Sequence, residues 1–171
     1  DGQLITNSIL SKPFVYNGRI ESDLSNDILK IVVVNRYHNA APSIAFIKNF
    51  GLQAGALASS VAHDSHNIVA VGTDDESLCA AINMVIENHG GLSFASENEQ
   101  LILPLPVAGL MSNEDGYRIA ELYTTLDKTV KEAGSTLNAP FMTLSFMALL
   151  VIPHLKLSDL GLFDGDQFAF I

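Results

Sequence analysis

Polar side chains able to do chemistry are concentrated in one short stretch of this chain. Three hydroxyls, two imidazoles, a carboxylate and an amide lie there between two apolar runs: Ser59, Ser60, His63, Asp64, Ser65, His66 and Asn67. Burying such groups in a sheet costs free energy unless they pair with one another. Functional side chains are often carried by loops that rigid elements hold in place. The stretch therefore indicates either a site that faces a substrate or another domain, or a polar turn that satisfies itself.

A metal site is one chemistry that these residue types suggest. His63, Asp64 and His66 carry imidazole and carboxylate groups, which are suitable ligands for zinc, iron or manganese. On a strand the two imidazoles would point to opposite faces, so only a turn could bring them together. Further ligands would have to come from a distant carboxylate or from the other histidines: His38, His89 and His154. We therefore expect no metal and no cofactor in this chain.

Nucleophilic catalysis is the other sharp alternative. Ser59, Ser60 and Ser65 lie near imidazoles, but none sits in the Gly-x-Ser-x-Gly elbow of serine hydrolases. The glycines nearby fit neither of the two common nucleotide-binding patterns. We therefore assign no catalytic residue and treat the seven polar residues as a candidate interface or substrate-facing set.

Three other residues could join this set or have purely structural roles. Arg36 and His38 follow a β-branched run, and they would meet the polar stretch if the two strands were neighbours. The alternative is an ordinary pair at a strand exit in solvent. We expect His89 to stabilise the C-terminal end of a helix by interacting with the helix dipole, and to have no role in catalysis.

Composition excludes some classes of partner. The chain has 171 residues, of which 48% are hydrophobic and 16% charged, and its formal net charge is −10. Such a balance argues against nucleic acid or an anionic membrane as a partner, because both are bound through basic side chains. The low polarity suggests that another protein surface covers part of this one.

The cysteine count and the hydropathy pattern indicate the cellular compartment of the protein. The single cysteine, Cys79, cannot form an internal disulfide and is expected to be a small buried side chain of a helix. No uncharged apolar run reaches the length of a membrane span, and no basic leader precedes an apolar segment. We expect a soluble, cytoplasmic protein.

Hydrophobic patterning predicts an α+β fold for residues 14–171, behind a linker-like segment at residues 1–13. A capping box at 73–76 and an apolar stripe predict a helix that stops at Gly90, and a second helix is expected from about 112 to Gly134. Runs typical of strands, with short connections that favour antiparallel or mixed pairing, lie at 14–20, 27–37, 43–50, on both sides of the polar stretch in 58–72, at 92–95 and at 100–103. We predict six to eight strands in one or two mixed, stacked sheets covered by two helices, an αββα-like layering.

Several blocks of the chain, taken together, resemble a known family. They are ASSVAHDSHNIVAVG at 58–72, GG at 90–91, LPLPVAGLMS at 103–112 and PFMTLSFMALLVIPHLKLSDLGLFD at 140–164. In this order they are similar to the C-terminal domain of bacterial-type adenine deaminases, over residues 28–171. One departure is Asn35, where the family's Glu-Arg-His-like segment would have a glutamate, and another is Tyr37, inserted before His38.

The resemblance implies a three-part parent enzyme: an amidohydrolase barrel with a two-metal site, a small β domain and this domain. Such a hydrolase converts adenine to hypoxanthine and ammonia with a water activated by manganese or iron. This chain has no His-x-His pair and is too short to hold the barrel. We therefore expect a domain that is inactive alone, packs on the barrel and presents His63 to Asn67 toward it. The alternative is a free-standing module that binds a purine such as adenine, or a similar small molecule. A homo-oligomer is expected in either case.

Overall fold

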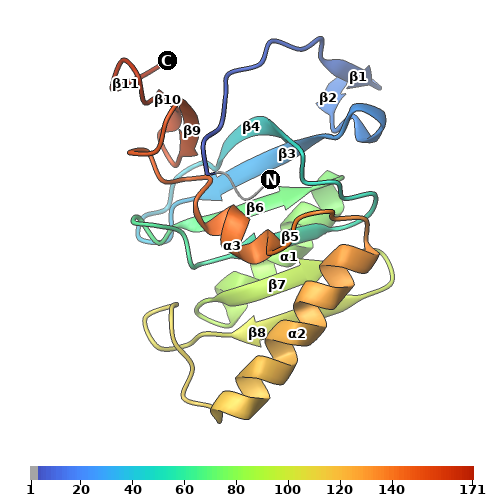
Figure 1. Cartoon of the computed structure of the whole chain (residues 1–171), viewed down its shortest axis with the longest axis vertical. Helices are drawn as coiled ribbons and strands as arrows, with labels where there is room; N and C mark the ends of the chain where they lie inside the picture. The colour runs from blue at the N-terminus through green and yellow to red at the C-terminus, as the bar shows by residue number, and fades with distance from the viewer. Residues whose placement is uncertain (1–3) are drawn as a thin grey trace.

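One six-stranded antiparallel sheet organises the molecule (Figure 1), which is described here from a computed structural model covering residues 4–171. Its strands follow the spatial order β4-β3-β6-β5-β7-β8, and every neighbouring pair is antiparallel. Their bounds are β3 (Ile28–Val34), β4 (Ser43–Lys48), β5 (Ala56–Ser59), β6 (Ile68–Gly72), β7 (Gly91–Ala95) and β8 (Gln100–Pro104). The four central strands are buried along most of their length because helices cover both faces of the sheet.

Two smaller sheets flank the main one. A hairpin is formed by β1 (Phe14–Tyr16) and β2 (Arg19–Glu21). Asn17 and Gly18 join its strands with positive φ angles of 49° and 77°, as a two-residue hairpin turn requires. The strand-like run predicted at 14–20 is thus a hairpin that turns at Asn17 and Gly18. A three-stranded sheet is built from β9 (Leu155–Ser158), β10 (Gly161–Asp164) and β11 (Ala169–Phe170).

Three α-helices and a short 3-10 helix, η1 (Leu24–Asn26), complete the fold. Helix α1 (Asp75–Glu87) lies on one face of the main sheet, and α2 (Gly116–Glu132) and α3 (Pro140–Ser145) lie on the other (Figure 1). The predicted cap of α1 is wrong by one residue: Asp74 accepts from the Ser77 amide, while Thr73 donates to the Gly55 carbonyl. Helix α3 was not predicted, because its six residues are too few to establish a period.

The layers differ from the prediction although the α+β class is confirmed. Val32, Ala58 and Ala70 pack under α1, whereas the opposite side of the same sheet packs on α2, α3 and β9. The helices therefore sandwich a single main sheet, and its pairing is antiparallel where a mixed pattern was allowed. Residues 4–171 contain eleven strands, more than predicted, because three short ones lie in an apolar tail that has no clear alternation.

Cys79 is exposed on α1, so its predicted burial is wrong. The buried side of this helix is formed by Leu78, Ala81 and Val85. Cys79 follows Leu78 directly, and one step of about 100° around a helix turns a side chain away from the buried stripe. In residues 4–171 we find no helix that combines the length and apolarity needed to span a bilayer.

The predicted linker segment is anchored to β9 within its described part. The Thr6 carbonyl accepts hydrogen bonds from the His154 and Leu155 amides, and the Thr6 hydroxyl donates to the Leu155 carbonyl. The first three residues of that segment lie outside the described residues.

Candidate functional site

Four segments meet at one end of the main sheet, which we call the loop end: residues 35–38, 60–67, 105–111 and 145–153. Strand β6 runs antiparallel to both β3 and β5, so β3 and β5 share a direction and finish at the same end of the sheet. Strand β8 also finishes there, because its last residue pairs with the first residue of β7. The topology thus brings the segments after β3, β5 and β8 together, although they lie far apart in the sequence.

Ser59 and Ser60 have structural roles at this end. Both are fully buried. The Ser60 hydroxyl donates to the Gly109 carbonyl at 2.6 Å and accepts from the Gly91 amide at 2.8 Å. The Ser59 hydroxyl accepts from the Val61 amide at 2.9 Å. These contacts occupy both hydroxyls, so neither serine is available to face a substrate.

The following residues turn outward. The His63 amide donates to the Ser145 carbonyl at 2.9 Å, and the His63 ring packs on Phe146 with centroids 4.6 Å apart. Asp64 and Ser65 are exposed. This part of the predicted set lies at the surface, with the His63 ring oriented by an aromatic neighbour.

His66 forms the end of the turn. Its backbone has a positive φ of 52°, and its amide donates to the Ala62 carbonyl. Its ring lies edge-on to that of His63, with centroids 6.4 Å apart. The buried Nδ1 atom of His66 has no hydrogen-bond partner in the described chain. Within residues 4–171, no three His, Cys, Asp or Glu side chains are placed to share a metal ion.

Asn67 joins the polar stretch to the end of β3, as predicted for neighbouring strands. Its side-chain oxygen accepts from the Arg36 amide at 3.2 Å, and the Tyr37 hydroxyl donates to the Ser65 carbonyl at 3.0 Å. The Arg36 guanidinium reaches further and donates from Nη2 to the Ala108 carbonyl at 2.7 Å. His38 does not share in this network, because its amide donates to Asn35 within an exposed local turn.

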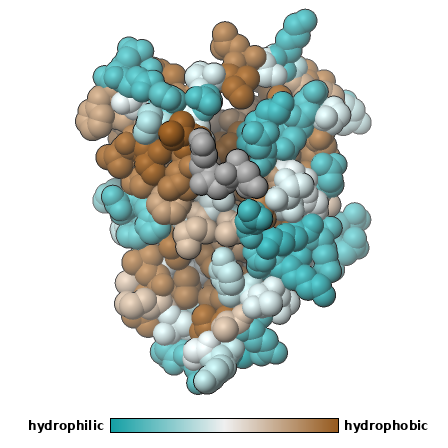
Figure 2. Space-filling view, viewed as in Figure 1, coloured by the Kyte–Doolittle hydropathy of each residue, from teal (hydrophilic) through white to brown (hydrophobic). Residues whose placement is uncertain are grey.

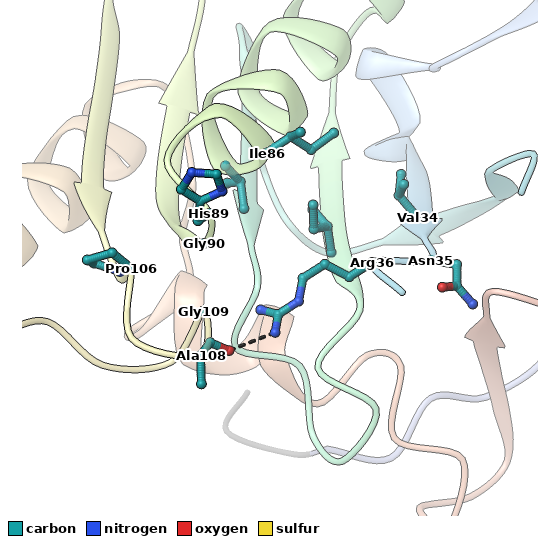
Figure 3. Close-up of a pocket in the computed structure, with 11 residues that line it drawn as sticks. Val34, Asn35, Arg36, Ile86, His89, Gly90, Pro106, Ala108 and Gly109 are labelled. Carbon is teal, nitrogen blue, oxygen red and sulfur yellow. Dashed lines mark hydrogen bonds between the residues drawn. The ribbon is translucent and has the colours of Figure 1, made fainter. Parts of the chain in front are cut away.

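Sequence reasoning missed a pocket of about 470 Å³ beside this network (Figure 3). Arg36, His89 and the 106–109 backbone line it together with apolar side chains from β3, β6 and α1. His89 lies just beyond the C-cap of α1, with a φ of 58°. The His-Gly-Gly run at 89–91 is typical of a helix stop, and it carries no information about the distant 106–109 segment.

Large apolar side chains surround the loop end without being covered. The exposed fraction is 57% for Tyr37, 56% for Met111 and 70% for Val151, which lie in three of the four segments. In the space-filling view, hydrophilic residues cover α2 on the right, whereas hydrophobic residues reach the surface on the left, toward the loop end (Figure 2). Exposed apolar side chains that cluster in this way are typical of a surface that another protein covers.

Comparison with known proteins gives consistent matches over most or all of the chain. A family model described as "Adenine deaminase C-terminal domain" matches residues 3–169. An adenine deaminase of Methanosarcina barkeri is 51% identical over 171 residues, which is 100% of this chain and 31% of that protein. Those of Sulfurovum sp. and Salinibacter ruber are 56% and 53% identical, over 89% and 100% of this chain and 29% and 32% of their own lengths. The chain thus spans about a third of the length of the curated relatives it matches.

Proposed function

The chain belongs to the adenine deaminase C-terminal domain family, and on this premise we propose that it docks through its loop end on the catalytic part of an adenine deaminase. The parent reaction is hydrolysis of adenine to hypoxanthine and ammonia. The domain alone is inactive. Its role is to present His63, His66 and their neighbours to the rest of the enzyme.

One observation carries this proposal: buried polar atoms without partners lie at the same end as the exposed apolar side chains. Three such atoms occur in the described residues, and two of them, Arg36 Nη1 and His66 Nδ1, belong to the loop end. An unmet buried donor or acceptor costs about 1–3 kcal/mol. Both atoms are closed to solvent, so a docked partner satisfies them only if the loop end opens toward it or shares an ordered water with it, whereas apolar contact with the exposed Tyr37 and Met111 stabilises the docked state directly.

The positions of His63 and His66 suit side chains that orient a group of the docked domain. The packing of the His63 ring on Phe146 restricts its rotation, so it can offer a nitrogen in a defined direction. Within residues 4–171, no three His, Cys, Asp or Glu side chains are placed to bind the manganese or iron implied for the whole enzyme. We therefore derive no step of the reaction from a metal held by this domain.

The test is substitution of His63 or His66 by alanine in the full-length enzyme. We expect kcat/KM for adenine to fall by about tenfold or more, as is usual when a positioned polar group is lost from a reaction site. Melting of the 171-residue chain should change little, because both rings are only partly buried. Lys128→Ala is the control, since Lys128 lies on the exposed face of α2, outside the loop end. Full activity in both variants would reduce the stretch to a structural turn.

The claim that the domain is inactive alone has its own test. The 171-residue chain should not deaminate adenine when supplied with manganese or iron. Turnover comparable to that of a full-length enzyme would contradict the docking proposal, because it would locate the whole reaction in this chain.

Compartment and assembly belong to the same proposal. The single exposed thiol of Cys79 suits a reducing cytoplasm, where no disulfide is needed. The uncovered apolar side chains also favour a homo-oligomer of the complete enzyme. Sedimentation of the full-length protein would test the assembly, and a monomer would contradict it.

A further inference from the structure

The β1–β2 hairpin carries exposed apolar side chains on both of its faces. Its register places Val15 opposite Ile20 on one face, and Phe14 and Tyr16 lie on the other. All four side chains are between 48% and 63% exposed. The hairpin lies away from α2 and α3 (Figure 1), and it makes no extensive contact with any other helix or strand of residues 4–171. Because a two-stranded hairpin without packing is only marginally stable in water, we expect a partner to cover this one.

A second apolar surface is uncovered on the α1 face of the main sheet. Helix α1 packs on β5, β6, β7 and β8 and leaves β3 and β4 largely without a covering helix on this face. Ile44 and Phe46 of β4 lie on this side, because they pair in register with Val32 and Lys30. They are 60% and 41% exposed. We call Ile44 and Phe46 the β4 strip.

The hairpin and the loop end lie at opposite ends of β3. The hairpin leads into the first residue of this strand, whereas the loop end lies beyond its last residue. Docking at the loop end therefore does not by itself cover the hairpin.

The uncovered apolar surface around the hairpin is large enough for a stable protein interface. Ile9 and Leu10, in the segment that leads into the hairpin, are also exposed. Half-exposed side chains of this size present roughly 100 Å² each. Together with the hairpin and the β4 strip, these residues approach the ~800 Å² per partner that a standard protein interface buries.

Unpaired charges of opposite sign accompany the two surfaces. Arg19 of the hairpin has no carboxylate within 4 Å in residues 4–171. The first turn of α1 lies beside the β4 strip, because Asp75 contacts Lys30, the register partner of Phe46. The next residue, Glu76, is exposed and has no Lys, Arg or His nitrogen within 4 Å in the same part of the chain. One molecule thus carries an apolar hairpin with a cation and an apolar strip with a carboxylate, which complement each other.

We propose that two copies of this chain form a two-fold dimer in which the hairpin of each copy lies on the β4 strip of the other. Arg19 of one copy then faces Glu76 of the other. Such an interface uses the same patch on both copies and closes after two, so it leaves no hairpin free to extend a filament. The proposal rests on the homo-oligomer proposed above for the complete enzyme and names the surface that forms it.

Sedimentation equilibrium of the 171-residue chain tests the dimer, because in this chain only a second copy can cover the hairpin. We expect a monomer–dimer equilibrium that Tyr16→Ser and Phe46→Ser each weaken by at least about tenfold, as is usual when a buried aromatic anchor is lost. Tyr37→Ser and Met111→Ser alter loop-end side chains of similar exposure, and these matched controls should leave dimerisation unchanged. A chain that stays monomeric up to millimolar concentration, or equal weakening by the controls, would overturn the proposal.

Charge reversal tests how the two copies are arranged. Arg19→Glu and Glu76→Arg should each weaken dimerisation several-fold, and the double variant should recover it, because the pair is restored with its charges exchanged. A double variant that dimerises no better than the single ones would contradict the placement of the hairpin on the β4 strip. The altered side chains are exposed, so dilute monomers of all variants should melt close to the unaltered chain, which assigns any loss of dimerisation to the interface.

This dimer and docking at the loop end fail independently. If the isolated chain is monomeric while the full-length enzyme is an oligomer, the homo-oligomer stands and the hairpin proposal is lost. If the chain dimerises through its hairpin but the His63 and His66 variants keep full activity in the full-length enzyme, the docking proposal is lost instead.

Discussion

Two cationic side chains at opposite ends of β3 have contrasting surroundings. Lys30, near the start of the strand, is 7% exposed and contacts the carboxylates of Glu21 and Asp75. Arg36, just past the end of the strand, has no carboxylate within 4 Å among the described residues and leaves one nitrogen unpaired. The cation at one end of the strand is paired with carboxylates, and the cation at the other end is not. This difference separates a satisfied ion cluster from a cation that no carboxylate of the described chain pairs.

The Lys30 cluster joins three parts of the chain. Burial pulls the pKa of Lys30 down, but its hydrogen bonds to Asp75 and Glu21 and their attraction outweigh this effect, so the pKa lies above its ordinary value. The contact ties the β1–β2 hairpin to the first turn of α1. Because Lys30 already pairs with two carboxylates within the domain, its charge is not available to bind a partner.

The largest expected effect comes from breaking the Lys30 cluster. Lys30→Met removes one partner from two carboxylates and should lower the free energy of unfolding by about 2–4 kcal/mol. Arg36→Gln should cost about 1 kcal/mol, because it removes one hydrogen bond to a loop carbonyl. Urea unfolding of both variants measures the contrast. Equal losses would show that the two ends do not differ in the way described.

A smaller effect is expected within the polar stretch. Ser60→Ala removes a buried hydroxyl that joins Gly91 to Gly109, and it should cost about 1–3 kcal/mol. The exposed Ser65 is the control, and Ser65→Ala should cost less than about 0.5 kcal/mol. Thermal melting of the isolated chain distinguishes them. Equal losses of stability in the two variants would contradict the division of this stretch into a buried structural part and an exposed part.

Lys156 provides a third comparison with Lys30. It is 2% exposed, its amine donates to the Leu4 carbonyl, and burial lowers its pKa to about 8. Because the folded pKa lies below the ordinary value of 10.5, the cost of the buried charge is fully present below pH 8. This cost is relieved as the pH rises from about 8 to 10.5, so the contribution of Lys156 to stability increases over that range.

Lys156→Met should therefore stabilise the chain at pH 7 by about 1–2 kcal/mol and remove this pH dependence. The measurement is the difference between the stability profiles of the variant and the unaltered chain from pH 6 to 10. A difference that is constant with pH would contradict the lowered pKa.

The smallest expected effect on stability lies at the outermost part of the loop end. Asp64→Ala should change the free energy of unfolding of the isolated chain by less than about 0.5 kcal/mol, because the side chain is exposed. In the full-length enzyme the same substitution should weaken interdomain contact, which limited proteolysis would detect as faster release of this domain. An unchanged rate of release would place the interface elsewhere.

Much of the fold could be predicted from local patterns. The β-branched run of β3, the strands around the polar stretch and the stripe of α1 each have a period that belongs to one kind of element. The tail that contains α3 and β9–β11 could not be resolved, because its residues are apolar without a regular period. The layering depended on which face each helix covers, and no local pattern carries that information.

For the site, the sequence by itself determined which polar groups lie together along the chain and which family the chain resembles. Only the tertiary structure decided how each group is used. The Ser60 hydroxyl is occupied by a carbonyl 49 positions away, and Arg36 by one 72 positions away. Hydrogen bonds over such separations depend on how strands are ordered in the sheet. The polar stretch is thus a local property of the chain, whereas its division into buried supports, an open loop end and an adjoining pocket is a property of the fold.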